Sequence, residues 1–188
     1  MGDQADENTV RQRHPELLAW LSAREAAFEG WAGELGPLER WDFGTDSLDD
    51  LEEVVRERYA GLEEVRAAKD SDFVQGATWY VGEVVRRSFA ACGTHAPLVW
   101  MYDPEPPAGH APSAFFDPGT GVVTNTPFLG TRDAVDGEWL YPLGVINELY
   151  STENEWGDPV EPRLRGAVHD PYDDDDDDDD DEGVGGEG

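Results

Sequence analysis

The stretch SDFVQGATWYVGEVVRRSFAA, residues 71–91, decides the fold expected for this chain. Its apolar side chains recur at three- and four-residue steps and cover more than one face of a helix. This pattern predicts the most buried helix of the protein. Asp70 or Ser71 can cap its start, and Gly93 suits its end. The other elements are therefore expected to pack around this helix.

Two helices are expected before it. Pro15 begins the first, whose apolar residues recur at helical spacing until Gly36 and Pro37 end it. A second apolar stripe runs from Ser47, which resembles the first residue of a capping box, to Leu62. Its opposite face is charged. We interpret that face as a solvated surface with opposite charges three or four residues apart.

The pattern changes after the long helix. Residues 95–102 are rich in strand formers, and the turn signal within 114–124 predicts a hairpin. Residues 142–150 predict a short last helix that begins with proline. Segregated helices and strands indicate an α+β fold, in which N-terminal helices pack on a small antiparallel sheet and a short C-terminal helix follows.

The length of 188 residues is typical of one domain. We expect a flexible lead-in at 1–14, a single α+β domain at 15–160, and a linker with a disordered acidic tail at 161–188. Nine consecutive aspartates, 173–181, dominate that tail and cannot build a core.

The chain is strongly acidic along its whole length. It has 43 Asp and Glu against 13 Lys and Arg, a net charge of −30. Residues 1–87, 88–162 and 163–188 each hold ten more acids than bases, so the excess is not confined to the tail. Direct binding to nucleic acid or an anionic membrane is not expected, because phosphates are bound by clustered Lys and Arg. A basic protein partner is electrostatically favoured.

Several classes of site are not expected. No apolar run approaches the roughly 20 residues of a membrane span, and the acidic start does not resemble a secretory signal. One cysteine, Cys92, forms no internal disulfide, so a cytoplasmic location is the default. The histidines lack metal-ligand spacing, and neither a phosphate-binding loop nor a nucleophile elbow is present. We therefore expect no metal, no cofactor and no enzymatic activity.

Glu83 is the most informative single residue, because it lies among apolar neighbours in the middle of the long helix. Arg86 and Arg87 follow at pairing distance, which favours an intrahelical ion pair. The alternative is a half-buried carboxylate that faces a groove left open by Gly82. In that case a small ligand or a substrate would bind in a pocket near Glu83, Trp100 and Trp139.

The second half of the chain combines dense aromatics with few bases. Aromatic side chains surrounded by carboxylates are suited to an interface with a basic protein. Trp139 and Trp156, which glycines and acids flank, are the aromatics most expected to be exposed. The candidate interface residues are Glu83, Trp100, Tyr102, Glu138, Trp139, Glu153, Glu155 and Trp156.

The segment WYVGEVVRRSF, residues 79–89, resembles uncharacterised small acidic bacterial proteins whose central helix carries Tyr-x-Gly-Glu-x-x-x-Arg. In those proteins a Trp-containing strand follows the helix, here at 98–100, and a Pro-bearing segment comes later, here at 126–128. The resemblance covers residues 47–150 and implies an immunity- or antitoxin-like binding protein. It supplies no catalytic residue.

These observations favour a non-enzymatic, acidic protein-interaction module that binds a basic partner, as an immunity protein, an antitoxin or a chaperone does. Nucleic-acid mimicry, in which carboxylates imitate phosphates, is a narrower form of this hypothesis. The small-ligand protein or enzyme with a pocket near Glu83 is the second hypothesis. In the third, the acidic charge only maintains solubility.

Overall fold

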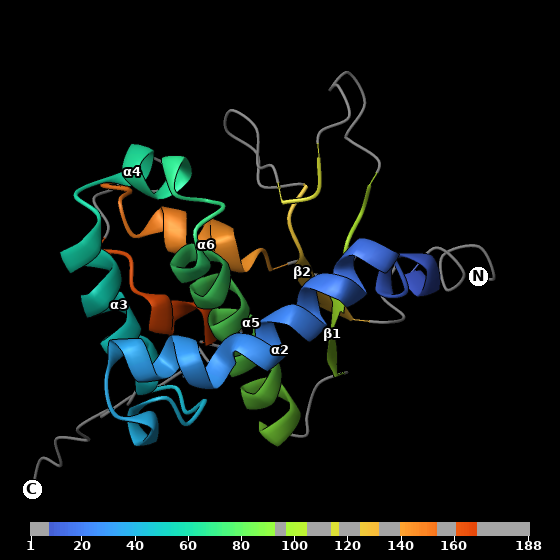
Figure 1. Ribbon diagram of the computed structural model, residues 1–188, viewed down its shortest axis with the longest axis horizontal. Helices are drawn as coiled ribbons and strands as arrows, with labels where there is room; N and C mark the ends of the chain where they lie inside the picture. Colours follow the sequence, from blue (N-terminus) through green and yellow to red (C-terminus); the bar gives the residue numbers. More distant parts are fainter. Residues whose placement is uncertain are drawn as a thin grey trace, which may run out of the picture.

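The computed structural model describes residues 8–92, 97–104, 114–116, 125–131, 140–153 and 161–168. Within these ranges it is an α+β fold, as the sequence predicts (Figure 1). The elements in chain order are α2 (Pro15–Leu35), η1 (Leu38–Arg40), α3 (Ser47–Arg58), α4 (Leu62–Ala67), α5 (Asp72–Cys92), β1 (Leu98–Met101), β2 (Phe128–Thr131), α6 (Pro142–Glu148) and η2 (Leu164–Val168).

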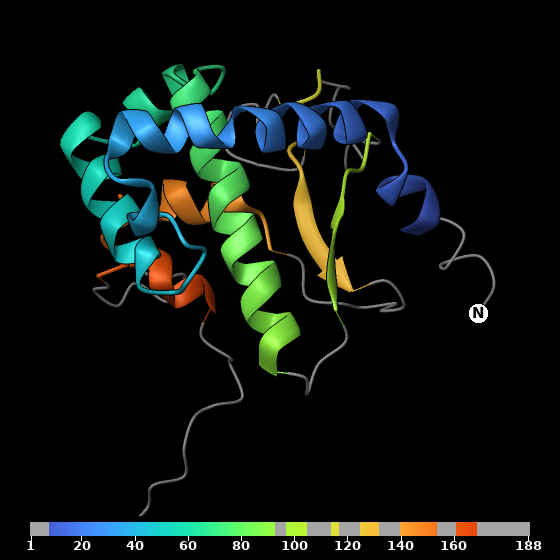
Figure 2. The same ribbon diagram turned by 60° about the horizontal axis from the view of Figure 1, so that its bottom comes forward.

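Helix α5 is the centre of the molecule, and its first two thirds are almost entirely buried. It packs against α2, α3, α6, η2 and both strands. Figure 2 shows α2 crossing α5, with the two strands beside α5. Gly76 allows the close approach of α2, because a Cβ there would lie 2.4 Å from Nε1 of Trp31. The prediction that this helix is the most buried one is confirmed.

The connection between α2 and α3 is fixed by a buried tyrosine. The hydroxyl of Tyr80 donates a hydrogen bond to Oγ of Ser47 (2.7 Å) and accepts one from the backbone N–H of Phe43 (3.1 Å). Phe43 has a φ of 63°, a conformation unusual for a residue with a Cβ. The Tyr80 hydroxyl therefore helps to hold the connection in this conformation.

The second predicted helix is shorter than its apolar stripe indicates. Helix α3 ends at Arg58, Tyr59 is extended, and a separate short helix, α4, begins at Leu62. Leu48, Leu51 and Val55 of α3 are buried against the core. Leu62 thus continues the apolar pattern without continuing the helix.

The sheet differs from the predicted hairpin. Strand β1 pairs antiparallel with β2, and Leu129 of β2 also bridges to Leu140. Phe115 and Phe116 lie in a turn instead of a strand, while 117–124 fall outside the described residues. The N–H of Phe116 donates to the carbonyl of Asn125 (2.9 Å), so the described residues on the two sides of 117–124 are hydrogen-bonded to each other.

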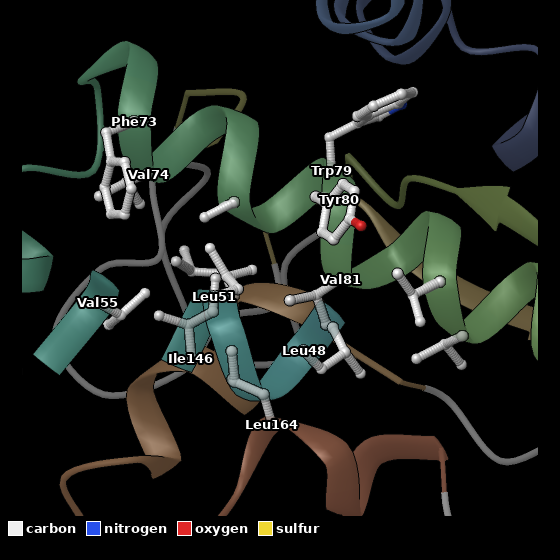
Figure 3. Packing of buried hydrophobic residues seen from close by; sticks show 14 of the residues in the cluster. Leu48, Leu51, Val55, Phe73, Val74, Trp79, Tyr80, Val81, Ile146 and Leu164 are labelled. Carbon is white, nitrogen blue, oxygen red and sulfur yellow. The ribbon is translucent and has the colours of Figure 1, made fainter. Parts of the chain in front are cut away.

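The folded body extends beyond both predicted boundaries. At the C-terminal side, Leu164 of η2 is fully buried in the core with Leu48 and Ile146 (Figure 3). At the N-terminal side, residues 8–12 are helical, and the carbonyl of Arg11 accepts a hydrogen bond from the N–H of Tyr102 (3.2 Å). The predicted domain boundaries at residues 14 and 160 therefore separate segments that pack against one another. Among the described helices, none has the length and apolar character needed to span a membrane.

Candidate functional site

Glu83 lies where α5 meets β1. The indole of Trp100 lies directly on Gly82, since a Cβ at Gly82 would be 2.2 Å from Cη2 of the ring. The side of the helix that was expected to open onto a groove at Gly82 is thus filled by Trp100. This contact brings Nε1 of Trp100 to 2.8 Å from Oε1 of Glu83, across 17 residues of sequence.

The Glu83 side chain is only 8% exposed, and its carboxylate accepts four hydrogen bonds. Arg86 binds it through two nitrogens, Nε to Oε1 (3.0 Å) and Nη2 to Oε2 (2.7 Å). Nε of Arg87 adds a longer bond to Oε2 (3.3 Å), and the Trp100 indole completes the set. Each carboxylate oxygen thus accepts two hydrogen bonds, which matches its two lone pairs.

These contacts determine the protonation state of Glu83. Burial by itself would raise the pKa of this carboxyl group. The hydrogen bonds from Arg86 and Trp100 and the charges of both arginines outweigh burial, and the pKa lies below its ordinary value. A carboxylate that is ionised and fully hydrogen-bonded is poorly suited to act as a general acid or base. The predicted ion pair with Arg86 and Arg87 is therefore present, and the arrangement does not favour an acid–base role for Glu83.

A groove with a volume of about 590 Å³ opens beside this carboxylate. We call it the α2–α5–β1 groove after the elements that form most of its walls. Arg87 is one of the lining residues, and its guanidinium carbon lies 3.6 Å from the ring centre of Phe43, which also lines the groove. The lining residues are Gln12, Leu21, Glu25, Phe28, Phe43, Trp79, Glu83, Arg86, Arg87, Leu98, Val99 and Trp100. The lining thus combines apolar and aromatic side chains with charged groups, a combination that binding grooves use.

The structure separates the predicted interface residues. Glu83, Trp100 and Tyr102 are buried, so these three candidate interface residues present little side-chain surface to a partner. Glu153 is exposed. The remaining candidate interface residues lie outside the described ranges: Glu138, Trp139, Glu155 and Trp156. Of the candidates, the described part of the structure brings together Glu83 and Trp100.

Sequence reasoning missed the α2 side of the groove. Leu21, Glu25 and Phe28 lie at helical spacing and line one wall, but the sequence showed them only as a stripe with one acid. Phe43 forms part of another wall from the loop before α3. No local signal indicates that α2 and this loop converge on α5, because the contacts join residues far apart in sequence.

A second buried carboxylate, Glu52 of α3, has a structural role. It accepts hydrogen bonds from Nε of Arg56 (2.9 Å) and from the N–H of Leu164 (3.1 Å). Arg56 also donates to the carbonyls of Leu149 and Pro162, both at 3.0 Å. This network ties η2 and the end of α6 to α3, which satisfies a buried charge with internal partners.

Most of the described bases are engaged in ion pairs, whereas several exposed acids are not. Among the described residues, every Lys and Arg except Arg13 and Arg58 forms an ion pair with a carboxylate of the chain. The exposed acids with no cationic partner in the described ranges include Glu25, Glu29, Glu34, Glu39 and Glu57. The charge left for a partner is therefore mainly negative.

No group of histidine, cysteine or acidic side chains in the described ranges is arranged to hold a metal ion. Cys92 is exposed at the end of α5. Comparison of the chain with family models, with curated proteins and with solved structures finds no match in any of the three. The function is therefore argued from the geometry and charge of this chain alone.

Proposed function

We propose that the chain is a non-enzymatic, acidic protein-interaction module that binds a basic partner protein, in the way an immunity protein, an antitoxin or a chaperone does. The observation that carries the proposal is the division of charge on the surface. Most described bases are engaged by carboxylates of the same chain, whereas Glu25, Glu29 and Glu34 of α2 and Glu57 of α3 are exposed and have no cationic partner among the described residues.

A surface of this kind attracts cationic proteins over distances of about one Debye length, roughly 8–10 Å at ordinary salt. Complementary charge increases the association rate and disfavours partners of like charge. Because Glu83 and Glu52 are already bound by internal donors, we assign the attraction to the exposed acids. Nucleic-acid mimicry would be a special case, in which DNA competes with the chain for the same partner.

The test uses the full chain as bait in an extract of its own cell at low salt. A retained basic protein is identified, purified and titrated against the chain by calorimetry. We expect a defined stoichiometry and a dissociation constant that rises with salt. A matched variant, in which the aspartates 173–181 are replaced by a Gly-Ser segment of equal length, separates the folded body from the tail.

Two results would contradict the proposal. If no basic protein binds the full chain with defined stoichiometry, the interaction role fails. If the Gly-Ser variant loses all binding, the exposed acids of the folded body are not the binding surface, and the argument from α2 and α3 fails.

A further inference from the structure

The free edge of β1 carries backbone groups that the fold does not use. Leu129 exchanges both of its backbone hydrogen bonds with Leu140 (2.8 and 3.0 Å), so its N–H and C=O point away from β1. Trp100 lies opposite Leu129 in the register. In an antiparallel pair, opposite residues either share both hydrogen bonds or share none. The N–H and C=O of Trp100 therefore point away from β2.

A second observation also indicates that the backbone groups of Trp100 point away from β2. Tyr102, two residues after Trp100, donates its N–H to the carbonyl of Arg11, which lies outside the sheet. Because backbone groups alternate with a period of two, those of Leu98 and Trp100 point to this same edge. Among the described residues, no hydrogen-bond partner is found for the N–H or C=O of either residue.

The α2–α5–β1 groove runs along this edge. Leu98 and Trp100 have side chains on one face of the strand and Val99 on the other, yet all three line the groove. This is expected when a groove follows the edge of a strand instead of covering one face. The unused edge and the apolar walls formed by Phe28 and Trp79 are therefore adjacent.

The charges at the rim indicate the chemistry of an occupant. Glu25 lines the groove, Glu29 is exposed one helical turn away, and no cation of the described chain pairs with either. Arg86 and Arg87 at the opposite wall are engaged by Glu83. An added segment thus meets unpaired negative charge on the α2 side together with the apolar side chains that line the groove.

We infer that the basic partner adds an extended segment, with alternating apolar and cationic side chains, as a strand on the free edge of β1. The inference rests on the proposed function and specifies its binding mode. Backbone groups of the segment pair with Leu98 and Trp100, an apolar side chain enters the groove, and a Lys or Arg lies against Glu25. This mode is β-strand addition, in which main-chain bonds give affinity and pockets give specificity.

Two other occupants fit less well. The aspartates 173–181 of the chain itself would bring carboxylates against Glu25. A second copy would bring another chain of net charge −30 to the same surface, which long-range repulsion opposes.

The test uses the peptide Lys-Val-Lys-Val-Lys-Val-Lys, blocked at both ends, and the full chain. Two derivatives are N-methylated, one on every valine and one on every inner lysine. All valine N–H groups lie on one edge of an extended peptide and all lysine N–H groups on the other. We expect one derivative to bind at least tenfold more weakly than the parent and the other to keep its affinity. Charge attraction alone cannot distinguish the two derivatives.

Variants of the chain provide the matched comparison. Leu98→Pro removes one edge N–H at the first residue of an edge strand, where proline is tolerated, whereas Leu98→Ala keeps that N–H. We expect Leu98→Pro to weaken binding at least tenfold more than Leu98→Ala does. Glu25→Lys should also weaken binding at least tenfold. Glu34→Lys, on the same helix but away from the groove, should have a much smaller effect.

The outcomes are separable. If the parent peptide binds but the two N-methylated derivatives bind equally well, strand addition is wrong while binding through charge survives. If Leu98→Pro does not fold, the two N-methylated peptides alone decide whether strand addition occurs. If the parent peptide does not bind the wild-type chain, the inference fails, and the extract experiment still tests the proposed function. A wild-type dimer that Leu98→Pro converts to a monomer would assign the edge to a second copy and overturn the inference.

Discussion

The contact between Gly82 and Trp100 makes Gly82→Ala a demanding test of the central packing. The new Cβ would lie 2.2 and 2.3 Å from two ring carbons of Trp100 and 3.1 Å from Cγ of Pro142. Carbon atoms in favourable contact are about 3.5–4 Å apart, so the ring must move by more than about 1 Å. A movement of this size also removes the hydrogen bond from the indole to Glu83.

The magnitude follows from these two effects. Overpacking of a core costs about 1–3 kcal/mol, and a lost hydrogen bond to a charged group costs about 1.5–3 kcal/mol. The higher helix propensity of alanine returns about 0.5–1 kcal/mol. We therefore expect Gly82→Ala to lower the free energy of unfolding by about 1.5–5.5 kcal/mol, a large part of the roughly 5–15 kcal/mol of a typical domain.

The assay is urea unfolding followed by far-UV circular dichroism and tryptophan fluorescence. The matched control is Gly33→Ala in α2, where a Cβ meets no atom within 4 Å, and which should stabilise the protein by about 0.5–1 kcal/mol. In a Trp100→Leu background the cost of Gly82→Ala should be much smaller. A loss below about 0.5 kcal/mol, or an equal loss in both backgrounds, would refute the packing argument.

Three further predictions concern the buried polar groups and η2. Glu83→Gln should lower the free energy of unfolding by about 1–3 kcal/mol near neutral pH, because the arginines and the indole lose their carboxylate partner. The folded-state pKa of Glu83 lies below its ordinary 4.5, so the stability advantage of the wild type over Glu83→Gln is present above pH 4.5 and disappears as the pH falls through the folded-state value. Urea unfolding of both proteins over a pH series checks this dependence. An advantage that grows toward acid pH would contradict it. Leu164→Ala should cost about 2–5 kcal/mol in thermal unfolding, and a negligible loss would show that η2 is peripheral. Tyr80→Phe should lower the free energy of unfolding by about 1–2 kcal/mol, because the hydrogen bonds to Ser47 and from the N–H of Phe43 are lost. Burial raises the pKa of Tyr80, so its phenol should ionise at higher pH than free tyrosine in an absorbance titration. Ionisation at the pH of free tyrosine would be inconsistent with the structure.

Helices α2, α5 and α6 were predictable because their signals are local. Helix α5 has a continuous apolar pattern, and α2 and α6 begin with Pro15 and Pro142, which suit a first turn. The pairing of Glu83 with Arg86 was also visible, because residues three apart are neighbours on a helix. Sequence patterns of this kind depend only on the helical period.

The sheet and the groove were not predictable from such signals. Strand β2 is four residues with no alternating pattern, and its partner β1 lies 30 residues away across a segment that carries a stronger turn signal. The contact of Trp100 with Gly82 likewise depends on how β1 packs on α5. At Gly82 the sequence shows a missing side chain, which suggests an opening, but it does not show the Trp100 ring that occupies this space.

The hydrogen bond between Glu52 and Leu164 joins residues 112 positions apart. Because a chain emerges from the ribosome from its N-terminus, α3 is complete long before its η2 partner is synthesised. During this interval the carboxylate of Glu52 has its helical partner Arg56 but lacks the N–H of Leu164, and the apolar surface that Leu164 covers is open to other proteins. Closure of the core is thus a late, non-local event, and the nascent chain is most vulnerable to aggregation before η2 has emerged.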